Sequence, residues 1–189
     1  SRPPQALSSR LQRTDTDMSK RKNIALIFAA ALVLRLLYIF EIADNPFFNS
    51  PVTDAHTYSQ QAREIAAGHW LDYTPGPFWQ PPLYPWLAGA VYWLSNGHFF
   101  LAMRLVQAVI GAASCVLLYL VGLRLFTANA ALLAAFALAF YGTAIYFDAE
   151  ILPASVAGLL FLMVILTVLA SSDKTSPWYW TAPGLLVGL

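Results

Sequence analysis

Carboxylates in two places give this chain its strongest candidates for chemistry. Asp54 lies in the segment VTDAHTYSQQA, and Asp148 and Glu150 lie close together in YFDAEILPAS. A positioned carboxylate can act as a general base that takes a proton from an attacking hydroxyl group. We therefore take Asp54, Glu150 and Asp148 as candidate catalytic residues.

Each of these acids also has a purely structural interpretation. Aspartate is a preferred N-cap residue, worth about 1 kcal/mol, and Asp54 stands where a short helix is expected to begin, with Tyr58 at i+4 on the same face. On spacing alone, the N-cap is the better interpretation of Asp54. Asp148 and Glu150 can likewise be solvated charges at the end of a helical hairpin, or they can cap the helix that follows.

Two arginines lie inside apolar stretches, where a charged side chain needs a partner. Arg35 is expected in the outer half of the first apolar stretch, and an arginine at the centre of a membrane helix costs roughly 2.5 to 3.5 kcal/mol on insertion scales. Arg104 is expected near the outer end of the second. Either side chain can hold a lipid phosphate or serve as a counter-ion for Asp148 or Glu150.

Hydropathy predicts the helices that must position these acids and arginines. Apolar residues make up 58% of the chain and charged residues only 11%, whereas soluble domains carry about 25% charged residues. Apolar runs of roughly the 20 residues that a membrane helix needs predict an all-α, polytopic transmembrane bundle. We expect a disordered cytoplasmic N-terminus over residues 1–22 and one transmembrane domain over 23–189, with spans near 24–43, 99–126, 128–147 and 151–170 and a fifth beginning near residue 178.

Lysine and arginine near the ends of these runs set the expected orientation. Residues 20–22 precede the first run, Arg124 closes the second, and Lys174 separates the fourth from the fifth. This arrangement places all three positions in the cytoplasm. The candidate acids, which have no part in that assignment, then fall on the opposite side of the membrane.

The long first outer loop, residues 44–98, is the most informative region between the spans. Helical spacing of its apolar residues predicts a helix from Thr53 to Gly68, where the glycine can end it. Prolines then favour an extended path. The apolar segment Leu83–Leu94 is too short to span the membrane and predicts a juxtamembrane helix.

Several classes of site are excluded by composition. A net charge of +1, without a basic cluster, gives no basis for nucleic-acid binding. The single Cys115 precludes a disulfide framework. His56, His69 and His98 lack the i, i+4 spacing of a zinc helix, so we assign no histidine metal site.

Five segments occur in an order that resembles a known family: LRLLYIF, DAHTYSQQAREIAAG, QPPLYPWL, MRLVQAVIGAASCVLLYLVGLRLF and YFDAEILPAS. Over residues 20–189 the chain is similar to the N-terminal part of bacterial GT-C glycosyltransferases, the group related to dolichyl-phosphate-mannose protein mannosyltransferases and to the lipid A aminoarabinose transferase. The resemblance implies a multi-pass protein of the bacterial cytoplasmic (inner) membrane.

The resemblance also implies a polyprenyl-phosphate-linked sugar donor, a lipid, protein or glycan acceptor, and an active site on the non-cytoplasmic face. Asp54 occupies the position of the family's first-loop carboxylate, and Glu150, with Asp148 beside it, that of the second-loop acid. Several relatives carry two adjacent acids in the first loop, whereas Ala55 follows Asp54 here, which leaves the use of a divalent metal open. Gln80 stands where some relatives have a lysine before paired prolines.

The chemistry of such a transfer agrees with the residue types. Phosphate is a good leaving group, so transfer needs mainly a base for the acceptor hydroxyl and a cation for the departing charge. Attack from the opposite face would invert the anomeric carbon. Tyr84 can line a lipid or sugar groove or anchor the chain at the interface. The candidate substrate-binding residues are Arg35, Tyr58, Arg104, Gln80 and Tyr84.

A polytopic transporter or lipid flippase is the main alternative function. Such proteins tend to place ionisable residues and broken helices at the bilayer midplane. Here the polar residues concentrate in one long outer loop, which favours chemistry at the membrane surface. A non-catalytic membrane subunit is a third alternative, and it would need no acid at a fixed position.

Overall fold

Long apolar helices build this protein. The computed structural model describes residues 4–71, 80–172, 174 and 176–188. In these residues, three helical stretches are long and apolar enough to cross a membrane: Met18–Glu41 of α1 (Pro4–Glu41), α4 (Phe99–Leu125) and α7 (Ala154–Ser171). No strand occurs in the described part of the chain. The predicted all-α fold of a multi-pass membrane protein is therefore confirmed.

The first helix begins earlier than the sequence analysis expects. Residues 1–3 lie outside the described residues, and the backbone is helical from Pro4 onward, where we expect a disordered segment. Proline is favoured in the first turn of a helix. The alanine, leucine, glutamine and arginine that follow have high helix propensity, so the helix of the span extends through them.

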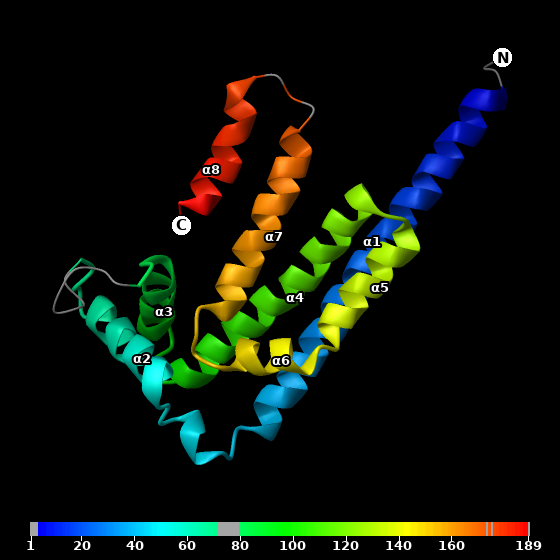
Figure 1. The fold of residues 1–189 in the computed structure, drawn as a ribbon. Coiled ribbons are helices and arrows are strands. Elements are labelled where there is room, and N and C mark those ends of the chain that lie inside the picture. Colours follow the sequence, from blue (N-terminus) through cyan, green and yellow to red (C-terminus); the bar gives the residue numbers. More distant parts are fainter. Residues whose placement is uncertain (1–3, 72–79, 173, 175, 189) are drawn as a thin grey trace.

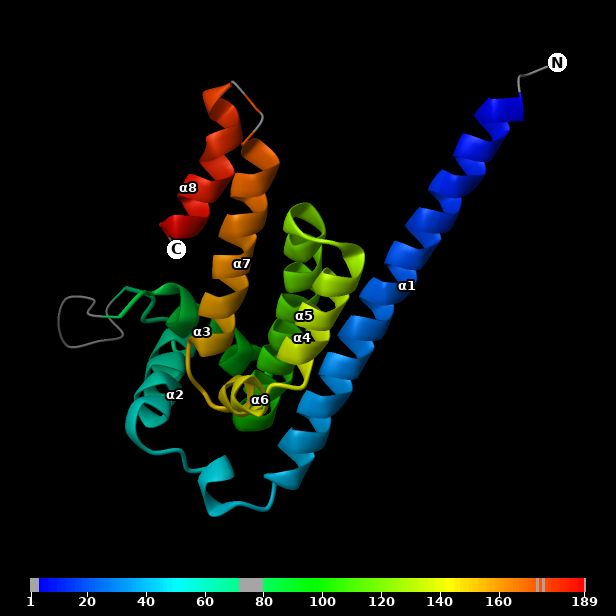
Figure 2. The same ribbon diagram turned by 45° about the vertical axis from the view of Figure 1, so that its right-hand side comes forward.

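The third apolar run forms two helices instead of one straight span. α5 (Ala128–Ala139) and α6 (Gly142–Ala149) meet at an angle of 52°. Thr127 caps α5, with its hydroxyl oxygen accepting from the backbone N–H of Ala130. The bend turns α6 across the end of the bundle, as Figures 1 and 2 show. The last residues of the run therefore cross α4 rather than continue along it.

The first outer loop carries the two helices that the sequence predicts. α2 (Thr53–Ala66) follows the short 3-10 helix η1 (Pro46–Phe48), and α3 spans Leu83–Leu94. Gly68 follows the C-cap residue Ala67 and terminates α2, and its φ of +107° suits glycine. The N–H of Gly68 donates to Ile65 O, and that of His69 to Glu64 O, which is the Schellman pattern. The predicted end of this helix is thus confirmed.

The α4 helix is the centre of the bundle, and α1, α3, α5, α6 and α7 pack against it. Small residues permit these close approaches. A Cβ at Gly122 would overlap Ala131 of α5, and a Cβ at Gly111 would overlap Asp148 of α6. Cys115 is fully buried between them. The small-residue stripe of this span therefore serves helix packing.

The last described elements follow α7. Pro153 precedes α7 as its N-cap, so this helix begins at Ala154, three residues after the expected start of the span at residue 151. The 3-10 helix η2 (Pro177–Trp180) and α8 (Thr181–Val187) then turn back along α7. The expected start of a fifth apolar helix near residue 178 coincides with η2.

The connections between helices gather at two ends of the bundle. Figure 1 shows the N-terminal end of α1, the α4–α5 turn and the α7–α8 turn at one end, and η1 and α6 at the other. The three basic positions from which we infer orientation belong to the first end. That this end faces the cytoplasm stays a prediction from the distribution of lysine and arginine.

Candidate functional site

A cavity of about 390 Å³ opens at the end of the bundle where η1 and α6 lie. The cavity is lined by the last turns of α1, the segment before α2, the first turn of α2, one residue of α4, Tyr146 of α6 and the chain after α6. Two candidate acids and one candidate arginine are among its lining residues, which are Tyr38, Ile42, Asn45, Phe47, Phe48, Pro51, Val52, Thr53, Asp54, Ala55, Arg104, Tyr146, Glu150 and Leu152. We call this space the carboxylate cavity.

Asp54 lies in the first turn of α2 and is exposed to the cavity. The N-cap residue of α2 is Val52, and no side chain makes a capping hydrogen bond. The interpretation of Asp54 as the helix cap is therefore wrong. Among the described residues, the Asp54 carboxylate has neither a hydrogen-bond partner nor an ion-pair partner.

The backbone just before Asp54 is strained. Thr53 has φ of +54°, a left-handed conformation that β-branched residues rarely adopt. Its hydroxyl donates to Val52 O at 2.7 Å. Strain of this kind persists only where the surrounding structure enforces it, and it clusters at functional sites. The sequence gives no signal of this feature.

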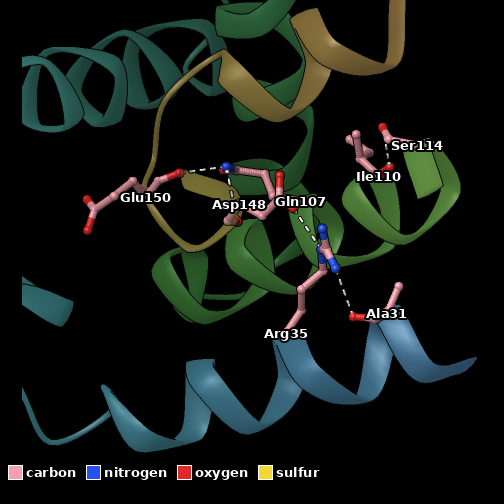
Figure 3. Close-up of polar contacts among 7 residues, drawn as sticks. All are labelled: Ala31, Arg35, Gln107, Ile110, Ser114, Asp148 and Glu150. Atoms are coloured by element: carbon pink, nitrogen blue, oxygen red, sulfur yellow. Dashed lines mark hydrogen bonds and ion pairs between the residues drawn. The ribbon is translucent and has the colours of Figure 1, made fainter. Parts of the chain in front are cut away.

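Glu150 follows the end of α6, where the backbone becomes extended, with φ −83° and ψ 146°. Its carbonyl accepts a hydrogen bond of 2.5 Å from Gln107 Nε2 of α4. The carboxylate is half-buried and has no hydrogen-bond or ion-pair partner in the part of the chain that the structure describes. Figure 3 shows this side chain directed away from Gln107 and Asp148.

Arg104 is the cation of the carboxylate cavity, and only 2% of its surface is exposed. Its Nε donates to Ala149 O at 2.8 Å and its Nη1 to Phe48 O at 2.9 Å. The guanidinium also lies 4.0 Å from the centre of the Phe48 ring. Arg104 thus connects η1 and the end of α6 to α4, while Nη2 makes no hydrogen bond to the described residues.

Arg35 and Asp148 lie outside this cavity and form a buried ion pair. Arg35 Nε donates to Asp148 Oδ2 at 2.7 Å, and Arg35 Nη1 donates to Ala31 O at 3.0 Å (Figure 3). Both side chains border a different, mainly apolar cavity between α4, α6 and α7. Of the two interpretations left open for Arg35, the geometry supports the counter-ion for Asp148.

Glycine at position 111 leaves room for this ion pair because it has no Cβ. A Cβ at residue 111 would overlap both the Asp148 carboxylate and the Arg35 guanidinium. The pair therefore joins α1 and α6 directly across the surface of α4. This geometry fixes the last turn of α1, which contributes Tyr38 to the carboxylate cavity, relative to the end of α6, which contributes Tyr146.

The other candidate binding residues are engaged inside the outer loop. Tyr58 meets Tyr84 edge to face at 4.9 Å between ring centres. Gln61 Nε2 donates to Gln80 Oε1 at 3.1 Å. None of the candidates Tyr58, Gln80 and Tyr84 lines the carboxylate cavity. Their predicted contact with substrate stays a hypothesis, and the structure shows them packing α2 and α3 together.

Tyr84 also connects the outer loop to the helix bundle. Its hydroxyl donates to Gln107 Oε1 at 3.1 Å. Burial, and to a lesser degree the neighbouring Tyr58, raises the pKa of Tyr84, so the hydroxyl stays protonated and keeps donating. Gln107 is fully buried, and its side-chain amide also donates a hydrogen bond to the carbonyl of Glu150. A relay of two side chains thus links α3 to the segment that bears the candidate acid.

The structure identifies functional candidates that sequence reasoning did not select. Tyr38, Asn45 and Tyr146 bring polar groups to the carboxylate cavity. Tyr38 follows Arg35 by three residues on one helix, and Tyr146 precedes Asp148 by two. The proximity of these tyrosines in the sequence to Arg35 and Asp148 is the signal that could have identified them.

Metal binding is constrained by the small number of acids. Asp54 and Glu150 are the acids among the lining residues of the carboxylate cavity that the structure describes. Elsewhere in that part of the chain, no group of three or more histidine, cysteine, aspartate or glutamate side chains could hold a metal ion. The two carboxylates could supply two oxygen ligands to a divalent cation, which normally takes six or more.

Comparison with known proteins agrees with this architecture. The model of the family described as dolichyl-phosphate-mannose-protein mannosyltransferase matches residues 79–189. The matched region contains Arg104, Gln107, Asp148 and Glu150, and it begins after the loop helix that carries Asp54. Searches among curated proteins and among solved structures gave no match.

The resemblance to GT-C membrane glycosyltransferases is thereby confirmed, and this family points to glycosyltransferase activity in general. The match spans more than half of the 189 residues. The chain therefore belongs to the dolichyl-phosphate-mannose-protein mannosyltransferase family.

Proposed function

We propose that this chain belongs to an inverting glycosyltransferase, which transfers a sugar from a polyprenyl-phosphate donor to an acceptor hydroxyl on the non-cytoplasmic face of the membrane. The observation that carries the proposal is the carboxylate cavity. Two carboxylates that have no hydrogen-bond or ion-pair partner in the described part of the chain line the same space as one buried guanidinium. Family membership supports the class of reaction.

Asp54 is the base in this mechanism. Its carboxylate takes the proton of the acceptor hydroxyl as the hydroxyl oxygen forms a bond to the anomeric carbon. The bond between that carbon and the phosphate oxygen breaks, and the polyprenyl phosphate leaves with the electron pair. Attack opposite the leaving group inverts the configuration.

Arg104 is the group that stabilises the departing phosphate. A guanidinium held by fixed carbonyl contacts costs little reorganisation when negative charge develops beside it. Three hydrogen bonds, to the carbonyls of Ala149, Phe48 and Phe100, hold Arg104 in this way. Glu150 orients the acceptor or the sugar hydroxyls from the other wall, and Tyr38 and Tyr146 contribute phenol groups.

Arg35 and Asp148 have a positioning role in this proposal. Because they are paired with each other, Asp148 is a weaker candidate for the base than Asp54 or Glu150. The ion pair sets the distance between the end of α1 and the end of α6, which are two walls of the carboxylate cavity.

Replacing Asp54 with asparagine tests the proposal. The variant keeps the shape of the side chain and loses the base, so sugar transfer should fall by about 10² to 10⁴-fold. The measurement is transfer of radiolabelled sugar from a polyprenyl-phosphate-linked donor to membrane acceptors by the full-length protein. Expression and thermal unfolding should not change.

Asp44→Asn is the matched control, because Asp44 is an exposed acid of the same loop and is not among the lining residues. It should transfer sugar at the rate of the unmodified protein. Full transfer by Asp54→Asn would remove Asp54 from the mechanism. Equal loss in both variants would indicate a general effect of loop charge and contradict the assignment of a specific base.

A further inference from the structure

A second cavity, of about 580 Å³, lies on another side of α2. Pro51 borders both this cavity and the carboxylate cavity, and the other lining residues of the two cavities differ. The segment before α2 thus separates two spaces. Protein sites for small ligands commonly have volumes of about 300 to 1,000 Å³, so the second cavity has room for a ligand of its own.

One wall of the second cavity is a polar face of α2. His56, Ser59, Gln60 and Arg63 all line it, at positions i, i+3, i+4 and i+7, which share one side of a helix. This face offers an imidazole, a hydroxyl, an amide and a guanidinium to the cavity. The Ser59 hydroxyl donates to His56 O at 2.7 Å, which leaves its oxygen as an acceptor. Such groups suit a ligand with many hydroxyls.

Another wall of the second cavity is aromatic. Tyr92 at the end of α3 and Phe99 and Phe100 at the start of α4 line it. Their rings form one cluster, with 5.2 Å between the centres of Tyr92 and Phe99 and 5.4 Å between those of Phe99 and Phe100. Aromatic faces beside hydrogen-bonding side chains can bind molecules that are apolar on one face and polar at the edge. Sugar rings have this character.

The charge of the second cavity is positive. No aspartate or glutamate is among its described lining residues, and Arg63 makes no ion pair in the described part of the chain. Its sequence neighbour Glu64 is paired with His69 at 2.9 Å. A guanidinium without an acid beside it favours an anionic group such as phosphate or carboxylate.

We propose that this second cavity is an accessory binding site for an anionic saccharide. The aromatic wall contacts the sugar ring, Ser59 and Gln60 bind its hydroxyls, and Arg63 binds its charged group. This site is separate from the carboxylate cavity, and its existence does not depend on the transfer reaction.

Binding of three probes tests the proposal: glucose 6-phosphate, glucose and inorganic phosphate. The full-length protein is placed in nanodiscs of phosphatidylcholine, and affinities are measured by saturation-transfer difference NMR for the sugars and by phosphorus NMR for phosphate. Because two sets of contacts act together only on glucose 6-phosphate, it should bind about tenfold more tightly than either other probe.

Three variants separate the contributions of the two walls. Arg63→Gln should weaken glucose 6-phosphate and phosphate by about tenfold and leave glucose unchanged. Tyr92→Leu should weaken both sugars and leave phosphate unchanged. Gln60→Ala changes an exposed side chain of α2 and should weaken the sugars with little effect on stability. The matched control is Arg124→Gln, which changes an exposed arginine at the other end of α4.

Two results would overturn the proposal. Phosphate binding as tightly as glucose 6-phosphate would show an anion site without sugar recognition. Binding that is insensitive to Arg63→Gln and Gln60→Ala but lost in Asp54→Asn would place the sugar in the carboxylate cavity. Because binding is measured without turnover, a failure of sugar transfer in the same preparations leaves this test intact.

Discussion

Asp148 and Glu150 are two residues apart, yet their carboxylates have opposite environments. Asp148 is buried in the last turn of α6 at 2.7 Å from Arg35. Glu150 follows the end of that helix and lines the carboxylate cavity. A buried carboxylate that is hydrogen-bonded to a guanidinium is already engaged, whereas one without such a partner at a cavity wall can meet a ligand. The helix end between the two acids decides which of them is available for chemistry.

The largest expected effect comes from breaking the ion pair. Asp148→Asn removes the negative charge and leaves Arg35 buried without a counter-ion, which should lower the free energy of unfolding by about 3 to 5 kcal/mol. The measurement is the unfolding equilibrium of the full-length protein in lipid nanodiscs. The double variant Arg35→Met, Asp148→Leu should recover most of this loss, because neither charge remains. A single variant as stable as the unmodified protein would contradict the structural role of the pair.

Crowding the ion pair should have the next largest effect. Gly111→Ala places a Cβ where the Asp148 carboxylate and the Arg35 guanidinium lie, and overpacking of this kind costs about 1 to 3 kcal/mol. Thermal unfolding measures it. Gly158→Ala is the matched control, because a Cβ at residue 158 meets nothing within 4 Å. Equal melting temperatures for the two variants would show that the close approach at Gly111 is not required.

Loss of the relay behind Glu150 should have an intermediate effect. Gln107→Leu leaves the Tyr84 hydroxyl and the Glu150 carbonyl without their partner, at a cost of about 1 to 3 kcal/mol for buried polar groups. Tyr84→Phe removes only one hydrogen bond and should cost about 1 kcal/mol. Chemical denaturation distinguishes the two. A larger loss of stability in Tyr84→Phe than in Gln107→Leu would contradict the assignment of Gln107 as the residue that joins Tyr84 to the Glu150 carbonyl.

The smallest effect on stability should come from Glu150 itself. Glu150→Gln changes a carboxylate without a partner in the described residues, so the free energy of unfolding should stay within about 0.5 kcal/mol. Sugar transfer should nevertheless fall, because Glu150 orients the acceptor or the sugar hydroxyls in the proposed mechanism. Comparing this variant with Asp148→Asn in both assays sharpens the contrast: one acid should matter for stability and the other for activity.

Local pattern predicted the helices of the outer loop well. The short apolar run Leu83–Leu94 is a helix over that range, and the glycine after α2 ends it as expected. Hydropathy did not show that the third apolar run is bent by 52°, because both segments of the run are apolar and hydropathy carries no information on the angle between them. The cap predicted at Asp54 was wrong because Val52 occupies that position, and side-chain preference is a weak guide to which residue begins a helix.

The amino-acid sequence by itself determined the class of fold, the approximate positions of the apolar runs and the family, since these depend on hydrophobicity and on motifs that are local in the chain. Only the tertiary structure decided the partners of the charged residues. Arg35 and Asp148 are 113 residues apart, and their contact depends on how α1, α4 and α6 pack. The same packing leaves Asp54 and Glu150 in one cavity, a relation between distant segments that no local pattern encodes.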